Sequence, residues 1–208
     1  TAQGSPLSPL LANLYLNDFC QRIAQQTPCR IVVYADDWVI LHRQAYTQRQ
    51  LDWFASELAA EGLKINREKT RVVDMSVRGA EFDFLGFSFK RIRGYYGGRE
   101  YIKIQPAKSS MAQFKDKIRQ IVKHRTSLTL GQLIDRVNPI IRGWRNYFAS
   151  AGYPRAVFFK LDWFVCARFY RWSRRLSQRA GKRLAQNAWE VLRQAGLQFL
   201  QPVAGACL

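Results

Sequence analysis

The sequence predicts an α+β fold in two parts, a mixed part over residues 1–105 and an all-helical part over residues 106–208. Strand-like alternation and β-branched runs lie before Pro106, and beyond it the apolar residues recur at helical spacing. The charge divides at the same place. Residues 1–105 carry 14 basic and 11 acidic side chains, whereas residues 106–208 carry 19 basic and 4 acidic ones.

The first residues predict a loop that leads into a helix. Ser8 is expected as the N-cap, with Pro9 at the first helical position. The expected apolar face of this helix comprises Leu10, Leu11, Leu14 and Phe19.

Residues 30–41 predict a tight antiparallel hairpin, because two apolar runs flank the adjacent acids Asp36 and Asp37. Asp is common in turns, so a plain surface turn whose acids face water is one interpretation. The other is a metal site. Two close carboxylates repel unless a cation lies between them, and Mg²⁺ prefers carboxylate oxygen.

The rest of the mixed part predicts short elements. A helix is expected over 47–60, with Gly62 ending it. Residues 63–66 alternate like a short strand, residues 82–90 are aromatic and strand-like, and a turn at 94–98 leads into a strand over 99–105.

Apolar stripes in the second part predict helices. One stripe runs from Met111 to Val122, and another covers 130–137, is interrupted at Asn138-Pro139 and resumes over 140–148. A third long helix is expected over 156–176, and a short one around 188–193.

Composition excludes several classes of protein. No apolar run is long enough to cross a bilayer, and no secretory signal pattern is present. The four cysteines have no paired spacing, which argues against a zinc knuckle or a disulfide framework and fits a reducing interior. We expect a protein of bacterial cytoplasm or an organelle that is not secreted. The net charge of +18 predicts a polyanionic partner, with nucleic acid favoured over an anionic membrane because aromatic and Arg residues are intermixed.

Five motifs, in order along the chain, resemble those of group II intron-type reverse transcriptases, also called maturases. The resemblance is carried by a template-and-nucleotide loop and helix (1–13), a catalytic hairpin (34–37), a following motif (62–66 with Lys69-Thr70), a primer-grip hairpin (84–87) and the maturase signature (142–148). It implies that residues 1–105 are the C-terminal half of a palm and residues 106–208 a thumb, or maturase-specific, RNA-binding domain.

The family implies an RNA-directed DNA polymerase of a group II intron with maturase activity in RNA splicing. Its partners would be intron or template RNA, a DNA primer and a dNTP, with no membrane, and a homodimer is left open. The fingers and the first palm Asp would precede Thr1, so we expect the chain to be a fragment that is inactive alone. A non-catalytic intron-RNA-binding splicing factor and a CRISPR- or defence-associated reverse transcriptase are the alternatives.

The resemblance also implies site residues in the first part. Asp36 and Asp37 would be catalytic and would hold Mg²⁺ in a two-metal site that is incomplete in this chain, and Lys69 would serve the pyrophosphate. Template, primer and nucleotide contacts are expected at Gln3, Gly4, Asn13, Tyr34, Leu85 and Gly86. Five of these residues have a plainer alternative: Tyr34 as a core aromatic, Lys69 as a solvated charge, Gln3 and Gly4 as turn residues, and Asn13 as a local cap or bridge.

In the second part, the RNA-binding residues are expected to be Arg142, Arg145, Asn146, Arg168, Arg171, Arg174 and Arg175. The last four, with Arg179, are expected to form a basic ridge that tracks a phosphate backbone, and an ordinary solvated face is the alternative. Trp144, Tyr147 and Phe148 are expected in the core.

Overall fold

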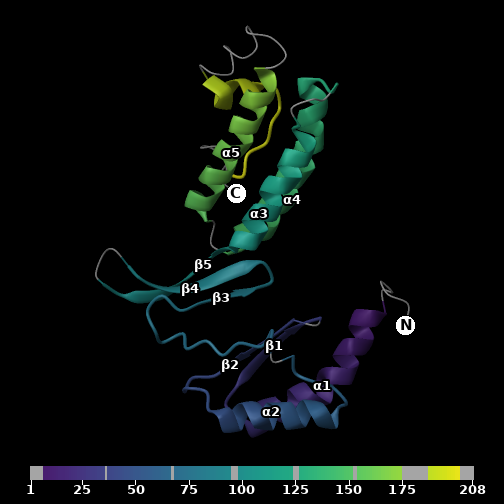
Figure 1. Cartoon of the computed structure of the whole chain (residues 1–208), viewed down its shortest axis with the longest axis vertical. Coiled ribbons are helices and arrows are strands. Elements are labelled where there is room, and N and C mark those ends of the chain that lie inside the picture. Colours follow the sequence, from purple (N-terminus) through teal and green to yellow (C-terminus); the bar gives the residue numbers. More distant parts are fainter. Residues whose placement is uncertain are drawn as a thin grey trace. The chain divides into compact units, whose positions relative to one another are not determined.

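The computed structural model describes residues 7–35, 37–66, 68–94, 98–123, 127–151, 154–174 and 187–201 (Figure 1). The chain divides into two compact units. The N-terminal unit comprises Thr1–Leu85 and Arg91–Tyr101, and the C-terminal unit comprises Gly86–Lys90 and Ile102–Leu208. Over the described residues, no helix is both long enough and apolar enough to span a bilayer.

Two helices and a hairpin form the body of the N-terminal unit. The elements follow one another as α1 (Ser8–Gln26), β1 (Arg30–Tyr34), β2 (Asp37–Leu41) and α2 (Gln48–Ala60). The hairpin pairs antiparallel from Arg30 opposite Leu41 to Tyr34 opposite Asp37, which confirms the predicted hairpin over 30–41.

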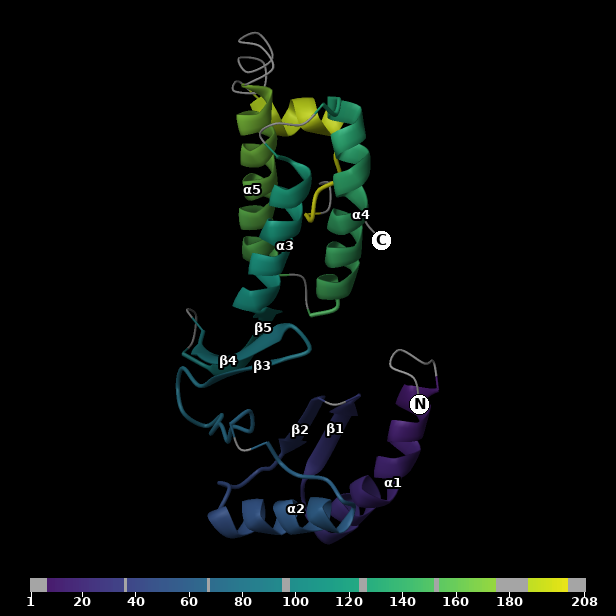
Figure 2. The same cartoon turned by 45° about the vertical axis from the view of Figure 1, so that its right-hand side comes forward.

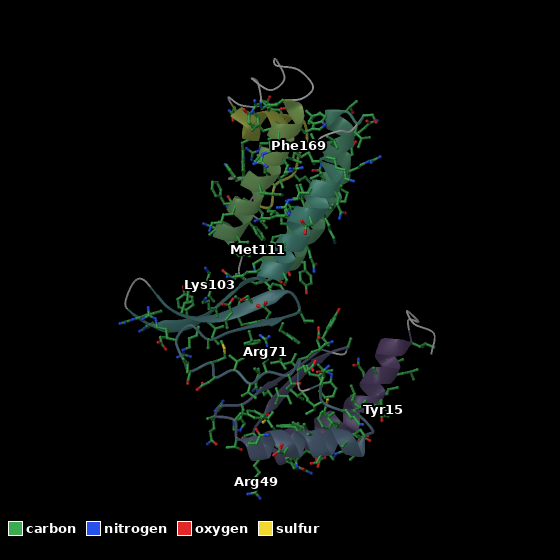
Figure 3. All side chains as sticks on the ribbon, in the orientation of Figure 1. Tyr15, Arg49, Arg71, Lys103, Met111 and Phe169 are labelled. Atoms are coloured by element: carbon green, nitrogen blue, oxygen red, sulfur yellow. The ribbon has the colours of Figure 1, made fainter. Side chains whose placement is uncertain are left out.

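The core of this unit lies between the hairpin and the two helices (Figure 2). Phe19 and Ile23 of α1 and Phe54 of α2 are buried there, and Trp38 of β2 packs on Phe19 with ring centroids 5.3 Å apart. Tyr15 of α1 donates a hydrogen bond from its hydroxyl to the carbonyl of Glu61, just beyond α2 (Figure 3). The helices are therefore tied together at the end of α2 as well as through the core.

Two details of α1 differ from the prediction. The helix begins at Ser8, so the N-cap position falls on Leu7 rather than Ser8. The expected apolar face is also wrong, because Leu10 and Leu14 are exposed and the buried residue of that region is Leu16. At about 100° per residue, Leu10 and Leu14 lie about 120–160° around the helix from Leu16. The helix is therefore apolar on two sides, of which this unit buries one.

The second helix ends at the predicted residue, Ala60, and begins one residue later than predicted, at Gln48. Thr47 forms a capping box with Gln50, and Gly62, with φ of +74°, follows the end of α2. The strand expected over 63–66 is absent. Instead, the Asn66 side chain accepts hydrogen bonds from the backbone N–H groups of Glu68 and Lys69, which forms a turn.

Three further strands form a second sheet in the order β3 (Glu81–Phe84), β4 (Phe87–Arg93) and β5 (Glu100–Pro106). The stretch 82–90, expected to be one strand-like segment, is divided by a tight turn in which Leu85 has φ of 49° and Gly86 has φ of 75°. The backbone N–H of Gly94 bonds to the carbonyl of Arg99 at 2.8 Å between β4 and β5. Residues 95–97 of the predicted turn lie outside the described residues.

Three long helices, α3 (Lys108–Ile121), α4 (Leu130–Ala149) and α5 (Arg155–Ser173), lie lengthwise beside one another in the C-terminal unit (Figures 1 and 2). A short helix over 187–194, as predicted, crosses one end of this bundle (Figure 2). Segment 197–201 then returns along the bundle. The buried core residues of the three helices include Phe114, Ile118, Leu133, Ile141, Phe158 and Phe169.

The interruption expected at Asn138-Pro139 is wrong, because α4 runs through Pro139. Proline lacks the N–H that would bond to the preceding turn, so it normally weakens a helix. Here Pro139 is exposed, and buried Val137 and Ile141 hold the helix to the core on either side of it. The helix expected over 156–176 ends at Ser173, and residues 175–186 lie outside the described part of the chain.

Candidate functional site

The tip of the hairpin β1–β2 is the first part of the candidate site. Tyr34 and Asp37 are directly opposite each other across the strands, and Ala35 takes φ of 53° to close the turn. Asp36 lies outside the described residues. Tyr34 is 64% exposed, so the alternative that it is a core aromatic is wrong, and Asp37 is exposed beside it.

The described residues at this tip do not form a complete set of metal ligands. Leaving aside the undescribed positions, Asp36 among them, no three His, Cys, Asp or Glu side chains gather closely enough to hold an ion. Asp37 supplies hard carboxylate oxygen, the ligand type that Mg²⁺ prefers, but the described residues do not complete a site.

The other predicted residues of the first part are dispersed. Lys69 is exposed on the turn that Asn66 organises, and Asn13 is exposed on α1. Gln3 and Gly4 lie outside the described residues. The structure thus brings Tyr34 and Asp37 together, whereas Lys69 and Asn13 lie on separate elements.

The turn at Gly86 is tied to the start of α3. The Gly86 carbonyl accepts hydrogen bonds from the backbone N–H of Ala107 at 2.8 Å and from Ser110 Oγ at 3.0 Å. A Cβ at Gly86 would lie 2.8 Å from Ser110 Oγ. Ser110 was not expected from the sequence to hold this turn, since a lone serine near a helix start gives no signal of a partner 24 residues away.

The residues after Gly86 pack on the maturase-like motif of α4. The Phe87 ring lies 4.9 Å from that of Phe148 and 5.3 Å from that of Tyr147, centroid to centroid. Phe148 is buried and Trp144 is half-buried against it, as predicted. Tyr147 is 50% exposed, so its predicted place in the core is wrong.

The polar residues of that motif have different surroundings. Arg142 and Asn146 are exposed. Arg145 is half-buried and donates to the carbonyl of Phe199 at 3.3 Å. Arg145 therefore supports the returning segment 197–201, which limits its freedom to reach a ligand.

Arg168 does not share an exposed ridge with Arg171 and Arg174. Its guanidinium is half-buried and donates to the carbonyl of Val122 at 2.9 Å, at the C-cap of α3. The carbonyls at a helix end have no partner within the helix, so this bond satisfies one of them. Desolvation lowers the pKa of Arg168, with the charges of Arg171 and Arg119 acting in the same direction.

Arg171 and Arg174 are exposed, as a nucleic-acid interface requires. Arg175 and Arg179 lie outside the described residues. The structure therefore leaves Arg171 and Arg174 as the described members of the predicted ridge that face solvent.

Sequence reasoning missed Asp162. This side chain is fully buried in α5, and its two carboxyl oxygens accept the backbone N–H groups of Leu200 at 2.8 Å and Gln201 at 3.0 Å. Burial raises the pKa of Asp162 to about 6, against the opposite effects of these bonds and of the Arg145 charge. The signal was available, because Asp162 is the only acid between residues 155 and 174 and lies between apolar positions.

The comparisons with known proteins match both parts of the chain. Residues 1–89 match the family model described as reverse transcriptase (RNA-dependent DNA polymerase), and residues 111–191 match the one described as group II intron, maturase-specific domain. No curated protein matches the sequence. The first match contains the hairpin with Asp36 and Asp37, and the second contains the motif over 142–148. The chain belongs to the group II intron reverse transcriptase/maturase family.

Proposed function

We propose that the hairpin β1–β2 carries acids of the active site of an RNA-directed DNA polymerase, and that the C-terminal unit binds intron RNA. The observation that carries the first half is the pairing of Tyr34 with Asp37, which leaves Ala35-Asp36 as the turn between two strands. Asp37, directly after this turn, is exposed, so its carboxylate can receive a ligand from solvent, which supports the proposal.

Asp36 and Asp37 would hold Mg²⁺ as members of a larger ligand set. When bound, the ions neutralise charge on the attacking and leaving oxygens of nucleotidyl transfer. The exposed ring of Tyr34 supports a role beside the primer end, where it offers an apolar surface to a sugar or base. Lys69 is free to approach the pyrophosphate because its ammonium is exposed.

The template, primer and dNTP contacts of Gln3, Gly4, Asn13, Leu85 and Gly86 are part of the same proposal. The turn at Leu85-Gly86 supports it, since both residues have positive φ and form the tight hairpin that this part of the proposal requires. The domain boundary after residue 105 stays a prediction.

RNA binding by the C-terminal unit is supported by its charge. Residues 106–208 contain 19 basic and 4 acidic side chains, and one of the acids, Asp162, is buried. Exposed Arg142, Arg171 and Arg174 would contact phosphates, which gives affinity and salt dependence rather than choice of sequence.

A non-catalytic splicing factor is the second candidate. The charge excess lies in residues 106–208, away in sequence from the acids at 36 and 37, so RNA binding does not require polymerisation. The two candidate functions differ in whether the hairpin β1–β2 takes part in DNA synthesis.

Primer extension on an RNA template with Mg²⁺ tests the proposal. We compare the full-length gene product with its Asp36→Asn and Asp37→Asn variants, and use Asp52→Asn, which replaces an exposed acid on α2, as the matched control. Loss of an active-site metal ligand should lower DNA synthesis by about 100-fold or more. RNA binding should not change. Undiminished synthesis by Asp36→Asn would overturn the active-site assignment, and splicing activity without any synthesis by the wild type would favour the splicing factor.

A further inference from the structure

Helix α5 carries two large aromatic side chains on its solvent side. Phe159 is 54% exposed and Trp163 is 65% exposed, whereas Phe158, Leu161 and Val165 on the other side are fully buried or nearly so. Large apolar side chains that gather in the open on one face commonly mark a binding site. The core packs against the opposite face of α5, so packing within the core does not explain why two large aromatic side chains are present on this face.

The two rings border a hollow. A surface hollow of about 310 Å³ is lined by Phe159, Lys160 and Trp163. The aromatics are four positions apart in the sequence, which places them on one face about 6 Å apart along the helix axis. A planar base between two rings needs about 7 Å, twice the normal carbon–carbon contact distance. A small splay of the side chains therefore admits one flat ring.

One wall of the hollow is supported from behind. The Phe159 ring lies 6.3 Å from Trp189, and Trp189 in turn stacks on buried Phe199 with centroids 4.3 Å apart. A ring held in this way loses little freedom when a ligand stacks on it, so the surface is partly organised before binding.

Cations accompany the aromatics. Arg155, Lys160 and Arg171 are exposed on α5, and Arg174 is exposed at its C-cap. The only acid between residues 155 and 174 is the buried Asp162. A face that combines exposed rings with uncompensated positive charge suits a ligand that is flat, apolar on its faces and anionic along its chain.

We propose that the α5 platform, formed by Phe159, Lys160 and Trp163 with Arg155 before them and Arg171 beyond them along the helix, binds unpaired nucleotides. Bases stack on the two rings, and the cations hold the phosphates on either side. A duplex covers the faces of its bases, so the platform selects single strands, loops or bulges. The inference rests on the proposed RNA binding by the C-terminal unit and specifies which form of RNA that unit takes.

Equilibrium binding by the intact protein tests the platform. The probes are a fluorescent single-stranded RNA, the same strand with abasic residues, and a duplex of the same sequence. The variants are Phe159→Leu and Trp163→Leu, which keep an apolar side chain on the helix but remove the ring. Tyr147→Leu is the control, because Tyr147 is also a half-exposed aromatic but its ring is already stacked on Phe87.

Each platform variant should weaken binding of the single strand by about tenfold or more. The abasic strand and the duplex should bind wild type and variants alike, and Tyr147→Leu should behave as wild type. Circular dichroism should show unchanged helix content, since both replaced side chains are largely exposed.

Three outcomes would overturn the platform. The first is equal affinity of the wild type for normal and abasic strands, and the second is unchanged binding in a variant that combines Phe159→Leu with Trp163→Leu. The third is self-association of the wild type that Trp163→Leu abolishes, which would make the face a contact between copies. A wild type that binds none of the three probes would defeat the proposed RNA binding together with this inference. RNA binding that is unchanged when Phe159 and Trp163 are replaced would contradict the platform but not the proposed RNA binding.

Discussion

Asp162 Oδ1 accepts the backbone N–H of Leu200 at 2.8 Å, inside the C-terminal unit and 38 residues along the chain. With the bond from Gln201 at 3.0 Å, one carboxyl group holds the returning segment 197–201 against α5. Asn138 of α4 holds the same segment from the other side, since its amide oxygen accepts the N–H of Gln198 at 2.8 Å. The segment is thus fixed by polar contacts from two helices, and Leu197, Phe199 and Leu200 complete the core around them.

The stability of the C-terminal unit should depend on pH through Asp162. Its pKa is about 6 in the folded protein against an ordinary value of 3.8, so between these values the native state binds the proton that the unfolded chain releases. The contribution to stability is complete below about pH 4 and is lost as the pH rises through 6, with a magnitude of about 1–3 kcal/mol.

Urea unfolding of wild type and Asp162→Asn at pH 4 and pH 7 measures this effect. The variant does not titrate there and can accept only one of the two N–H bonds. It should be less stable at both pH values, and the wild type should exceed it by more at pH 4 than at pH 7. A difference that is the same at both pH values, or larger at pH 7, would contradict the raised pKa.

Gly86→Ala should destabilise the protein. Gly86 has φ of 75°, and a Cβ there would lie 2.8 Å from Ser110 Oγ and 3.7 Å from Phe148 Cζ. The strained backbone and the displaced serine together should cost about 1–3 kcal/mol in the free energy of unfolding.

Gly143→Ala is the matched control for that substitution. Gly143 lies within α4, and a Cβ there meets nothing within 4 Å, so alanine should stabilise the helix by about 0.5–1 kcal/mol. Thermal unfolding of both variants measures the two changes in stability. Equal effects of the same sign would show that the turn at Gly86 does not require a glycine.

Replacing Arg168 and replacing Arg171 should have opposite effects on stability and on the salt dependence of RNA binding, although both residues belong to the predicted basic ridge. Arg168→Gln removes the donor to the Val122 carbonyl and should lower stability by about 1–3 kcal/mol while leaving the salt dependence of RNA binding unchanged. Arg171→Gln should leave stability within about 0.5 kcal/mol, because Arg171 is exposed.

The salt series supplies the second half of that comparison. If Arg171 contacts a phosphate, its loss should reduce the slope of log affinity against log salt by about 0.7–0.9. An unchanged slope in Arg171→Gln, or a reduced one in Arg168→Gln, would contradict these assignments.

The sequence by itself determined the elements whose signals are local. The hairpin over 30–41 follows from two apolar runs around a short polar turn, and α2 follows from apolar residues at helical spacing over 51–58 and Gly62 beyond its end. The helical stripes likewise placed most of the bundle. The order of the motifs around Asp36-Asp37 and over 142–148 indicated the family that the comparisons then matched.

Only the tertiary structure decided which side chains face a partner within the chain. Leu10 and Leu14 are as apolar as Phe19, but the core meets one face of α1 and leaves theirs exposed. Arg168 and Arg171 look alike in sequence, and the nearby end of α3 distinguishes them by offering Arg168 a carbonyl. Asp162 required a segment 38 residues away, so nothing local could reveal its partners. Burial and long-range hydrogen bonds depend on what folds against a residue, and that information is distributed over the whole chain.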